Sequence, residues 1–202
     1  MTEKTEEEMF ATMERSLQVM KESVQDGLDK DKRSASGLTG GDAYKLNEAL
    51  KAGKNIAGHF FGNAMMKAVA VAQTNACMGR IVASPTAGSC GILPSALLTL
   101  QEEKNLVMAL FTASAVGIVI ATNASVAGAA GGCQAECGAA SAMAAAAMVE
   151  LCGGTPKQCE HACAIALKNI LGLVCDPVAG LVEIPCIKRN AGGVGNALVA
   201  AE

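Results

Sequence analysis

The 202-residue sequence is poor in aromatic side chains, with four Phe, one Tyr and no Trp. Binding of single-stranded nucleic acid relies on aromatic stacking and a basic groove, and the net charge of −3 offers no basic surface. Aromatic and β-branched residues favour strands, whereas alanine, which dominates here, has the highest helix propensity. With 51% apolar and 17% charged residues, disorder is excluded. We therefore expect an all-α, compact helical domain with no nucleic-acid partner.

The N-terminus lacks the apolar stretch of a secretory signal and opens with the acidic sequence MTEKTEEEMF. We therefore expect a cytoplasmic protein, in which disulfides are rare. Nine cysteines then have three alternative roles, namely metal ligation, redox chemistry or packing as small buried side chains. Packing is the expectation for most of them.

Charge is concentrated at the start of the chain. Residues 1–33 hold 15 of the 35 charged residues, and their apolar residues recur at helical spacing. A Ser- and Gly-containing break follows at 34–37. The sequence thus predicts an N-terminal charged helix and linker over 1–36 and one helical domain over 37–202.

A long uncharged run extends from residue 105 to 135. Its length suits either a membrane-spanning helix or a buried helix of a globular bundle. Gly, Ser, Thr and Asn within the run, and the absence of flanking aromatic or basic residues, favour the buried helix. We expect residues 105–132 to form a buried, uncharged central helix with no membrane partner; a small membrane helix bundle is the alternative.

Three cysteines lie in irregular sequence beside Gly or Pro: Cys133, Cys175 and Cys186. Zinc sites usually combine two CxxC pairs or include histidines, and neither pattern occurs around them. Three ligands without a fourth nearby suit an iron–sulfur cluster that has one open iron. Core packing remains the alternative on spacing alone.

A second group of residues, 84–94, combines Ser, Thr and Gly with two prolines ahead of an apolar helix. Such a loop can form a nest of N–H groups that binds a carboxylate or phosphate. It matches neither the P-loop nor the dinucleotide-binding fingerprint. An ordinary tight turn is the alternative.

Few titratable residues are available for catalysis. His59 and His161 are the only histidines, and both fall in predicted helices. Glu136 is the only charged residue between Lys104 and Glu150, and so isolated a carboxylate is paired, protonated or near a site. Asp176, directly after Cys175, belongs either to the site or to an Asp-Pro turn.

Three motifs, GRIVASPTAGSCGI at 79–92, GGCQAECG at 131–138 and GLVCDPVAGLVEIPCIKRNA at 172–191, together resemble the α subunit of iron–sulfur-dependent L-serine dehydratase. The resemblance implies that Cys133, Cys175 and Cys186 bind a 4Fe–4S cluster. It also implies that the loop bearing Ser84, Thr86, Ala87 and Gly88 binds the substrate.

The resemblance further implies a lyase of amino-acid degradation and gluconeogenesis that converts L-serine to pyruvate and ammonia. The cluster would act as a Lewis acid, and a β subunit would be the partner. Family α chains continue past the segment KRNAGGVGNA, so we expect a C-terminal part to be missing and this chain alone to be inactive. The general base is unidentified, with Glu136 and His161 as candidates. A pyridoxal-phosphate mechanism lacks a suitable lysine, and the alternative of another class is a non-catalytic helical scaffold.

Overall fold

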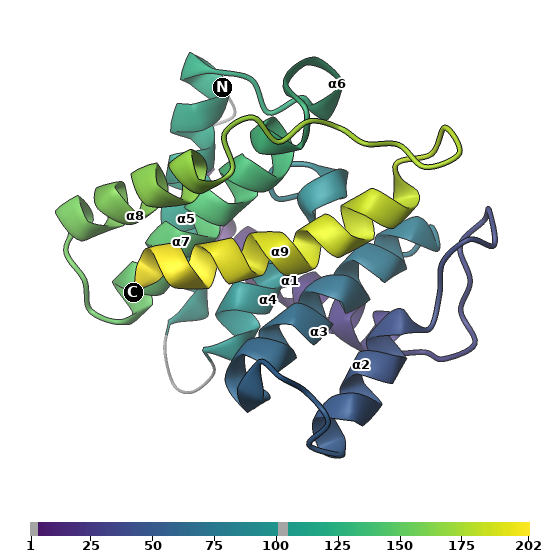
Figure 1. Ribbon diagram of the computed structural model, residues 1–202. Coiled ribbons are helices and arrows are strands. Elements are labelled where there is room, and N and C mark those ends of the chain that lie inside the picture. The colour runs from purple at the N-terminus through teal and green to yellow at the C-terminus, as the bar shows by residue number, and fades with distance from the viewer. Residues whose placement is uncertain (1–3, 101–104) are drawn as a thin grey trace.

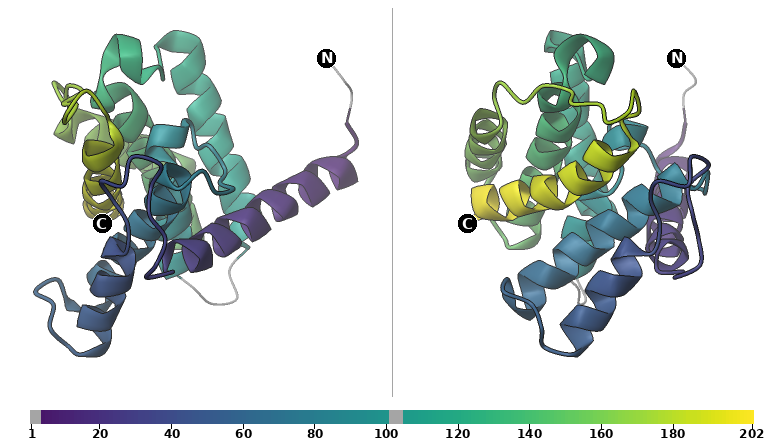
Figure 2. Two further views of the ribbon diagram at one scale, coloured as in Figure 1. Left: turned by 90° about the vertical axis from the view of Figure 1, so that its right-hand side faces the viewer. Right: turned by 45° about the vertical axis from the view of Figure 1, so that its right-hand side comes forward.

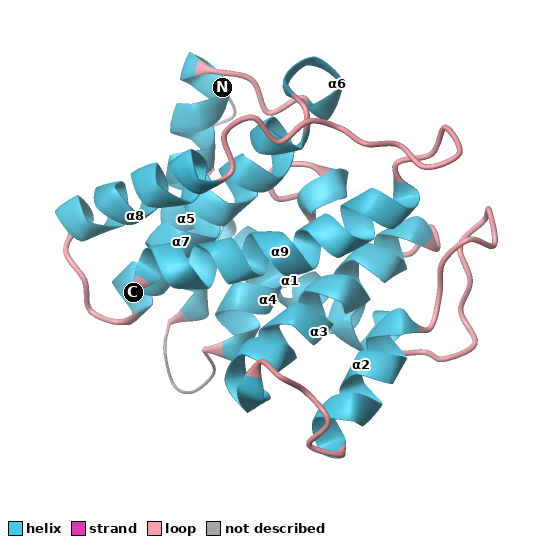
Figure 3. Cartoon of the chain, in the orientation of Figure 1, coloured by secondary structure: helices cyan, strands magenta, loops and turns pink. Residues whose placement is uncertain are grey.

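The computed structural model describes residues 4–100 and 105–202, and all regular elements in these ranges are helical (Figure 3). The elements are α1 (Glu6–Gly27), α2 (Asp42–Lys51), α3 (Gly58–Ala76), the 3₁₀ turn η1 (Ala87–Ser89), α4 (Ile92–Thr99), α5 (Leu106–Asn123), α6 (Gly128–Gly131), the π-helical turn η2 (Gln134–Gly138), α7 (Ala139–Leu151), α8 (Pro156–Asn169) and α9 (Glu183–Ala201). The predicted all-α fold is confirmed.

Local sequence signals account for two of the helix starts. The Thr5 hydroxyl accepts the Glu8 N–H, and the Glu8 carboxylate accepts the Thr5 N–H, which closes a capping box at α1. Thr155 and Gln158 form the same arrangement at α8, where Pro156 occupies the first turn. These caps satisfy backbone N–H groups that have no partner within the helix.

The core is built around α7, which packs against α4, α5, α8 and α9. Every residue from Ala139 to Val149 is buried. Because most of these side chains are alanine, neighbouring helices can approach α7 from all sides. In Figure 1, α9 crosses the front of the bundle between α8 and α3 and covers this core.

The expectation that residues 105–132 form the buried central helix is wrong. Only Ala109, Leu110, Ala113 and Gly117 of α5 are buried, and they form a narrow stripe. Ile118 and Val119 are 66% and 60% exposed. Among the described helices, α5 alone has the length and apolar composition to cross a membrane, with 22% of it buried. The central position belongs to α7 because its small residues can be packed on every side, whereas only the small-residue stripe of α5 fits closely against α7.

The N-terminal helix α1 packs on α3 and α5. A Cβ added to Gly27 would lie 1.9 Å from the Ala70 carbonyl oxygen, so the two helices approach closely there. The ring centroids of Phe10 and Phe111 lie 5.1 Å apart. Figure 2 shows α1 along one side of the bundle, with its first turns at the periphery.

Candidate functional site

The segments that carry Cys133 and Cys175 lie side by side. The Gln134 N–H donates to the Leu173 carbonyl at 2.9 Å, and the Gln134 side-chain carbonyl accepts the Gly172 N–H at 2.8 Å. Gly132 adopts φ +72°, and a Cβ there would lie 3.0 Å from the Leu173 oxygen. Glycine is therefore required at this position both for its backbone conformation and for the close approach.

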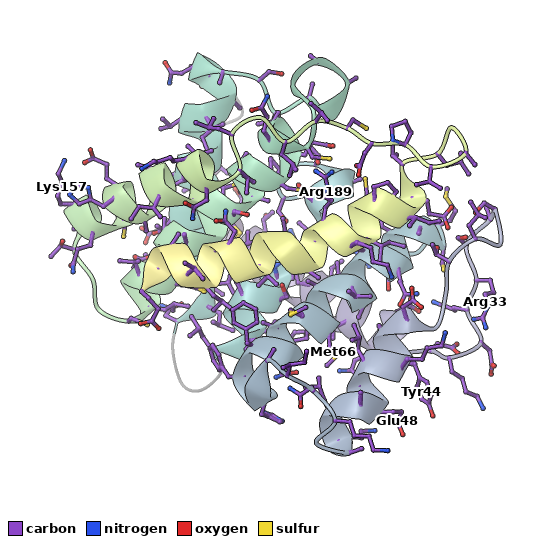
Figure 4. The ribbon with its side chains drawn as sticks, viewed as in Figure 1. Arg33, Tyr44, Glu48, Met66, Lys157 and Arg189 are labelled. Atoms are coloured by element: carbon purple, nitrogen blue, oxygen red, sulfur yellow. The ribbon has the colours of Figure 1, made fainter. Side chains whose placement is uncertain are left out.

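Arg189 joins the Cys175 segment to α9. Its guanidinium donates to the Val174 carbonyl at 3.3 Å and forms an ion pair with Asp176 at 2.9 Å. Figure 4 shows Arg189 rising from α9 toward the connection between α8 and α9. Since Cys186 lies one turn before Arg189 on α9, these contacts bring the second and third cysteine segments together.

Asn190 joins the predicted substrate loop to the same end of α9. Its amide donates to the Gly88 carbonyl at 2.8 Å and to the Cys186 carbonyl at 2.7 Å, and its side-chain oxygen accepts the Gly91 N–H at 2.8 Å. The side chain is fully buried. Nothing in the local sequence singles out Asn190, which follows Lys188 and Arg189 and whose loop partners are distant in the chain.

Glu136, on η2, lies against the substrate loop. A Cβ added to Gly88 would lie 3.1 Å and 3.2 Å from the two Glu136 carboxylate oxygens. A Cβ on Gly128 would lie 2.2 Å from one of them, so Gly128 leaves the space that the carboxylate occupies. The isolated charge in the sequence is therefore held between the loop and α6.

The loop at 84–91, which the sequence predicts to bind substrate, contains an unsatisfied donor. The Ser84 hydroxyl is buried and has no hydrogen-bond partner among the described residues. The Thr86 and Ser89 hydroxyls lie 3.1 Å apart, and the Ala87 carbonyl accepts the Asn75 amide at 3.1 Å. A buried hydroxyl without a partner is unfavourable, and a bound ligand would satisfy it.

The thiols around this site influence one another. Burial is the main cause that raises the pKa of Cys186 to about 11; the charges of Cys133, Glu136 and Cys175 act in the same direction, and Arg189 opposes them. Burial likewise raises the pKa of Cys133, with Arg189 opposing and Cys175 adding to the shift. Cys133 is buried, Cys186 partly buried and Cys175 exposed, so access to the group is from the Cys175 side.

Donors for a single metal ion do not converge at any point in residues 4–100 and 105–202: no three His, Cys, Asp or Glu side chains are placed to hold one. A single ion needs all its donors in one coordination sphere. In an iron–sulfur cluster each thiolate binds a different iron, so the donors surround a volume instead of meeting at a point.

The two histidines lie away from this group. His161 is exposed on α8, where its charge acts on the neighbouring Glu160, and His59 is exposed near the start of α3. No described hydrogen bond or ion pair joins either to Glu136 or to the three cysteines. Of the two predicted candidates for the base, Glu136 alone lies beside the loop.

An apolar surface borders the exposed cysteine. The connection that carries Cys175 exposes a series of large aliphatic side chains, which we call the 171–182 patch: Leu171, Val174, Val178, Leu181 and Val182 are each between 42% and 72% exposed. Exposed aliphatic residues gathered on one segment are typical of a protein–protein contact.

Comparison with known proteins identifies relatives over the whole chain. The family described as "Serine dehydratase alpha chain" matches residues 1–202. The chain is 55% identical to the "Probable L-serine dehydratase, alpha chain" of Bacillus subtilis, covering 100% of this chain and 68% of that protein. It is 45% identical to the "L-serine dehydratase, alpha chain" of Peptoniphilus asaccharolyticus, covering 98% and 70%. The "L-serine dehydratase TdcG" of Escherichia coli is 46% identical over 67% of this chain and 31% of that protein.

Proposed function

The chain belongs to the serine dehydratase alpha chain family, and we propose that it is the α subunit of an enzyme that converts L-serine to pyruvate and ammonia. We propose that Cys133, Cys175 and Cys186 hold a 4Fe–4S cluster. The observation that supports this most directly is the contact network of Gln134, Arg189 and Asn190, which gathers the three cysteine segments and the substrate loop.

The residues fit such a cluster in their chemistry. Cysteine thiolates are the usual protein ligands of iron–sulfur clusters, and three of them leave one iron for substrate. The three thiols come from separate segments that the side chains above hold together. When bound, the cluster would supply a Lewis acid for the hydroxyl and carboxylate of serine.

The chain's own residues supply binding and proton transfer. Backbone N–H groups and hydroxyls of the loop at 84–88 would bind the serine carboxylate, and the unpartnered Ser84 hydroxyl is available for it. Glu136, beside Gly88, would accept the Cα proton as the general base. The β-hydroxyl would leave as water with the proton that Glu136 accepted, and the aminoacrylate would tautomerise and be hydrolysed to pyruvate and ammonia.

A β subunit is the proposed partner. The relatives from Bacillus subtilis and Peptoniphilus asaccharolyticus are both described as alpha chains. The 171–182 patch borders Cys175, where access to the site lies, and burial of these aliphatic side chains by a partner would be favourable. Such a partner would also exclude water from the reacting groups.

The test is anaerobic reconstitution of the chain with iron and sulfide. We expect the broad visible absorbance of an iron–sulfur cluster, lost in C133S, C175S and C186S and retained in C159S, whose thiol lies on α8. Serine dehydratase activity should appear with the β partner. Failure to incorporate iron, or retention of the cluster in C186S, would contradict the proposal and favour a non-catalytic scaffold.

A further inference from the structure

We infer that Asn190 is a positioning residue that couples the substrate loop to Cys186; the inference rests on the proposed function. A single buried amide makes three hydrogen bonds of 2.7–2.8 Å, two to the loop at Gly88 and Gly91 and one to the carbonyl of Cys186. Asn190 lies 99 residues after Gly91 and 102 residues after Gly88 in the chain. The bond to the Cys186 carbonyl lies within α9, so the Asn190 side chain links the loop to the helical turn that carries this cysteine.

A second amide also holds the loop, since Asn75 of α3 donates to the Ala87 carbonyl at 3.1 Å, but it has no bond to the turn of Cys186. A Cβ added to Gly91 would lie 2.9 Å from the Asn190 oxygen and 2.3 Å from the Ala68 carbonyl oxygen, so the backbone is in close contact with both α9 and α3. On its other side the loop contacts Glu136 at Gly88. The loop is thus held between the side chains of Asn190 and Glu136.

Binding of serine requires the loop and Cys186 to be held at a defined separation. A serine molecule is small, so its carboxylate and hydroxyl can be bound together only if the loop and Cys186 keep a constant separation. Misplacement of reacting groups by about 1 Å lowers rates by about a hundredfold. An amide suits the role because it offers donors to two carbonyls and an acceptor to one N–H at the same time.

Asn196, two turns further along α9, provides a matched control. Its amide donates to the Ala166 carbonyl at 2.8 Å, and its oxygen accepts from Asn169 at 2.9 Å, so it fastens α9 to α8 instead of to the loop. Replacing Asn190 or Asn196 by Ala removes comparable hydrogen bonds from the same helix. Only N190A removes the bonds between α9 and the loop.

The first experiment measures alkylation of Cys186 by iodoacetamide in the full chain prepared without iron, at one pH, with peptide mass spectrometry. In N190A we expect the Cys186 rate to rise about tenfold, because the loop separates from the first turns of α9 more often. N196A should leave this rate unchanged, and exposed Cys152 should react equally in all variants. Equal Cys186 rates in N190A and N196A would overturn the inference.

The N190D variant distinguishes the acceptor of the Asn190 side chain from its donor. It keeps the acceptor for the Gly91 N–H but sets a carboxylate oxygen against the carbonyls of Gly88 and Cys186. We expect N190D to behave like N190A, since both lose the donors. A Cys186 rate in N190D equal to that of the unmodified chain would contradict a coupling through Gly88.

The second experiment measures KM and kcat for L-serine in the enzyme assembled with its β partner. N190A should raise KM, because the carboxylate loop is displaced, and N196A should not. A reconstituted cluster with the same KM in both variants would overturn the role of Asn190 while leaving the proposed function intact. Absence of a cluster would refute the proposed function, and the alkylation rates would still report the coupling.

Discussion

The core around α7 and the site at the start of α9 are held together by different interactions. From Ala139 to Val149 the core helix is buried among apolar neighbours. Among the described residues its few side-chain bonds to other helices run from Ser141 to the Gly193 carbonyl at 2.9 Å, and from the Cys159 and Cys163 thiols of α8 to carbonyls of α7 at 3.5 Å. The site is assembled from short segments by the side chains of Gln134, Arg189 and Asn190, which bond to backbone atoms. Core stability therefore depends on side-chain volume, and site geometry depends on particular polar atoms.

This difference implies that activity and stability respond to different substitutions. A change of volume in α7 should lower the free energy of unfolding, while the site stays competent below the melting temperature. A change of one polar atom at the site should remove activity with little effect on unfolding.

E136Q removes the proposed general base without changing its size. We expect kcat to fall by about 10²–10⁴-fold, the usual contribution of a general base, with the melting temperature nearly unchanged. Steady-state kinetics of the assembled enzyme and thermal unfolding provide the two measurements. E160Q and H161Q, both exposed on α8, serve as controls and should keep full activity. A fall in H161Q instead of E136Q would assign the base to α8.

A145L adds volume to the centre of the core, where Ala145 is fully buried. Overpacking should lower the free energy of unfolding by about 1–3 kcal/mol, measured by urea denaturation. A115L on the exposed part of α5 is the matched control and should stay within about 0.5 kcal/mol. Equal losses in the two variants would show that α5 is packed as tightly as α7.

High pH should destabilise the core through Cys163. Burial raises the pKa of this thiol from 9.0 to about 11. The folded state thus keeps a proton that the unfolded chain releases above pH 9, so the stabilisation is complete below pH 9 and is lost as pH rises toward about 11. Urea denaturation across this range should show a smaller decline in C163A. An identical decline in both proteins would contradict the assignment to Cys163.

R189Q should change stability least. Its ion pair with Asp176 is partly exposed, and such pairs contribute about 0–1 kcal/mol. K188Q removes the ion pair at 2.9 Å between Lys188 of α9 and Asp42 of α2, and it should have a similar effect on the free energy of unfolding. Only R189Q removes the contacts that hold the Cys175 segment. A chelator should therefore remove iron faster from the reconstituted R189Q chain than from the reconstituted K188Q chain. Equal rates of iron loss from both variants would show that Arg189 does not hold the segment.

The sequence singled out some residues of this region, but not the contacts between them. Glu136 stood out because it is alone in a long uncharged stretch, and the structure places it beside Gly88. Asn190 was overlooked because its partners are distant in the chain, and no local pattern marks a bond from residue 190 to 88. His161 has the right chemistry for a base but lies on an exposed part of α8.

The helical class can be predicted from the sequence, because alanine-rich segments bounded by Gly, Pro and capping residues favour helices wherever they lie. The sequence also shows which segments carry the cysteines. The central place of α7 and the peripheral place of α5 follow from tertiary packing, since hydropathy describes a helix and not the number of neighbours that fit against it. The same holds for the site. Its contacts depend on where the chain brings α9, η2 and the loop at 84–91 together, and that depends on packing of the whole bundle.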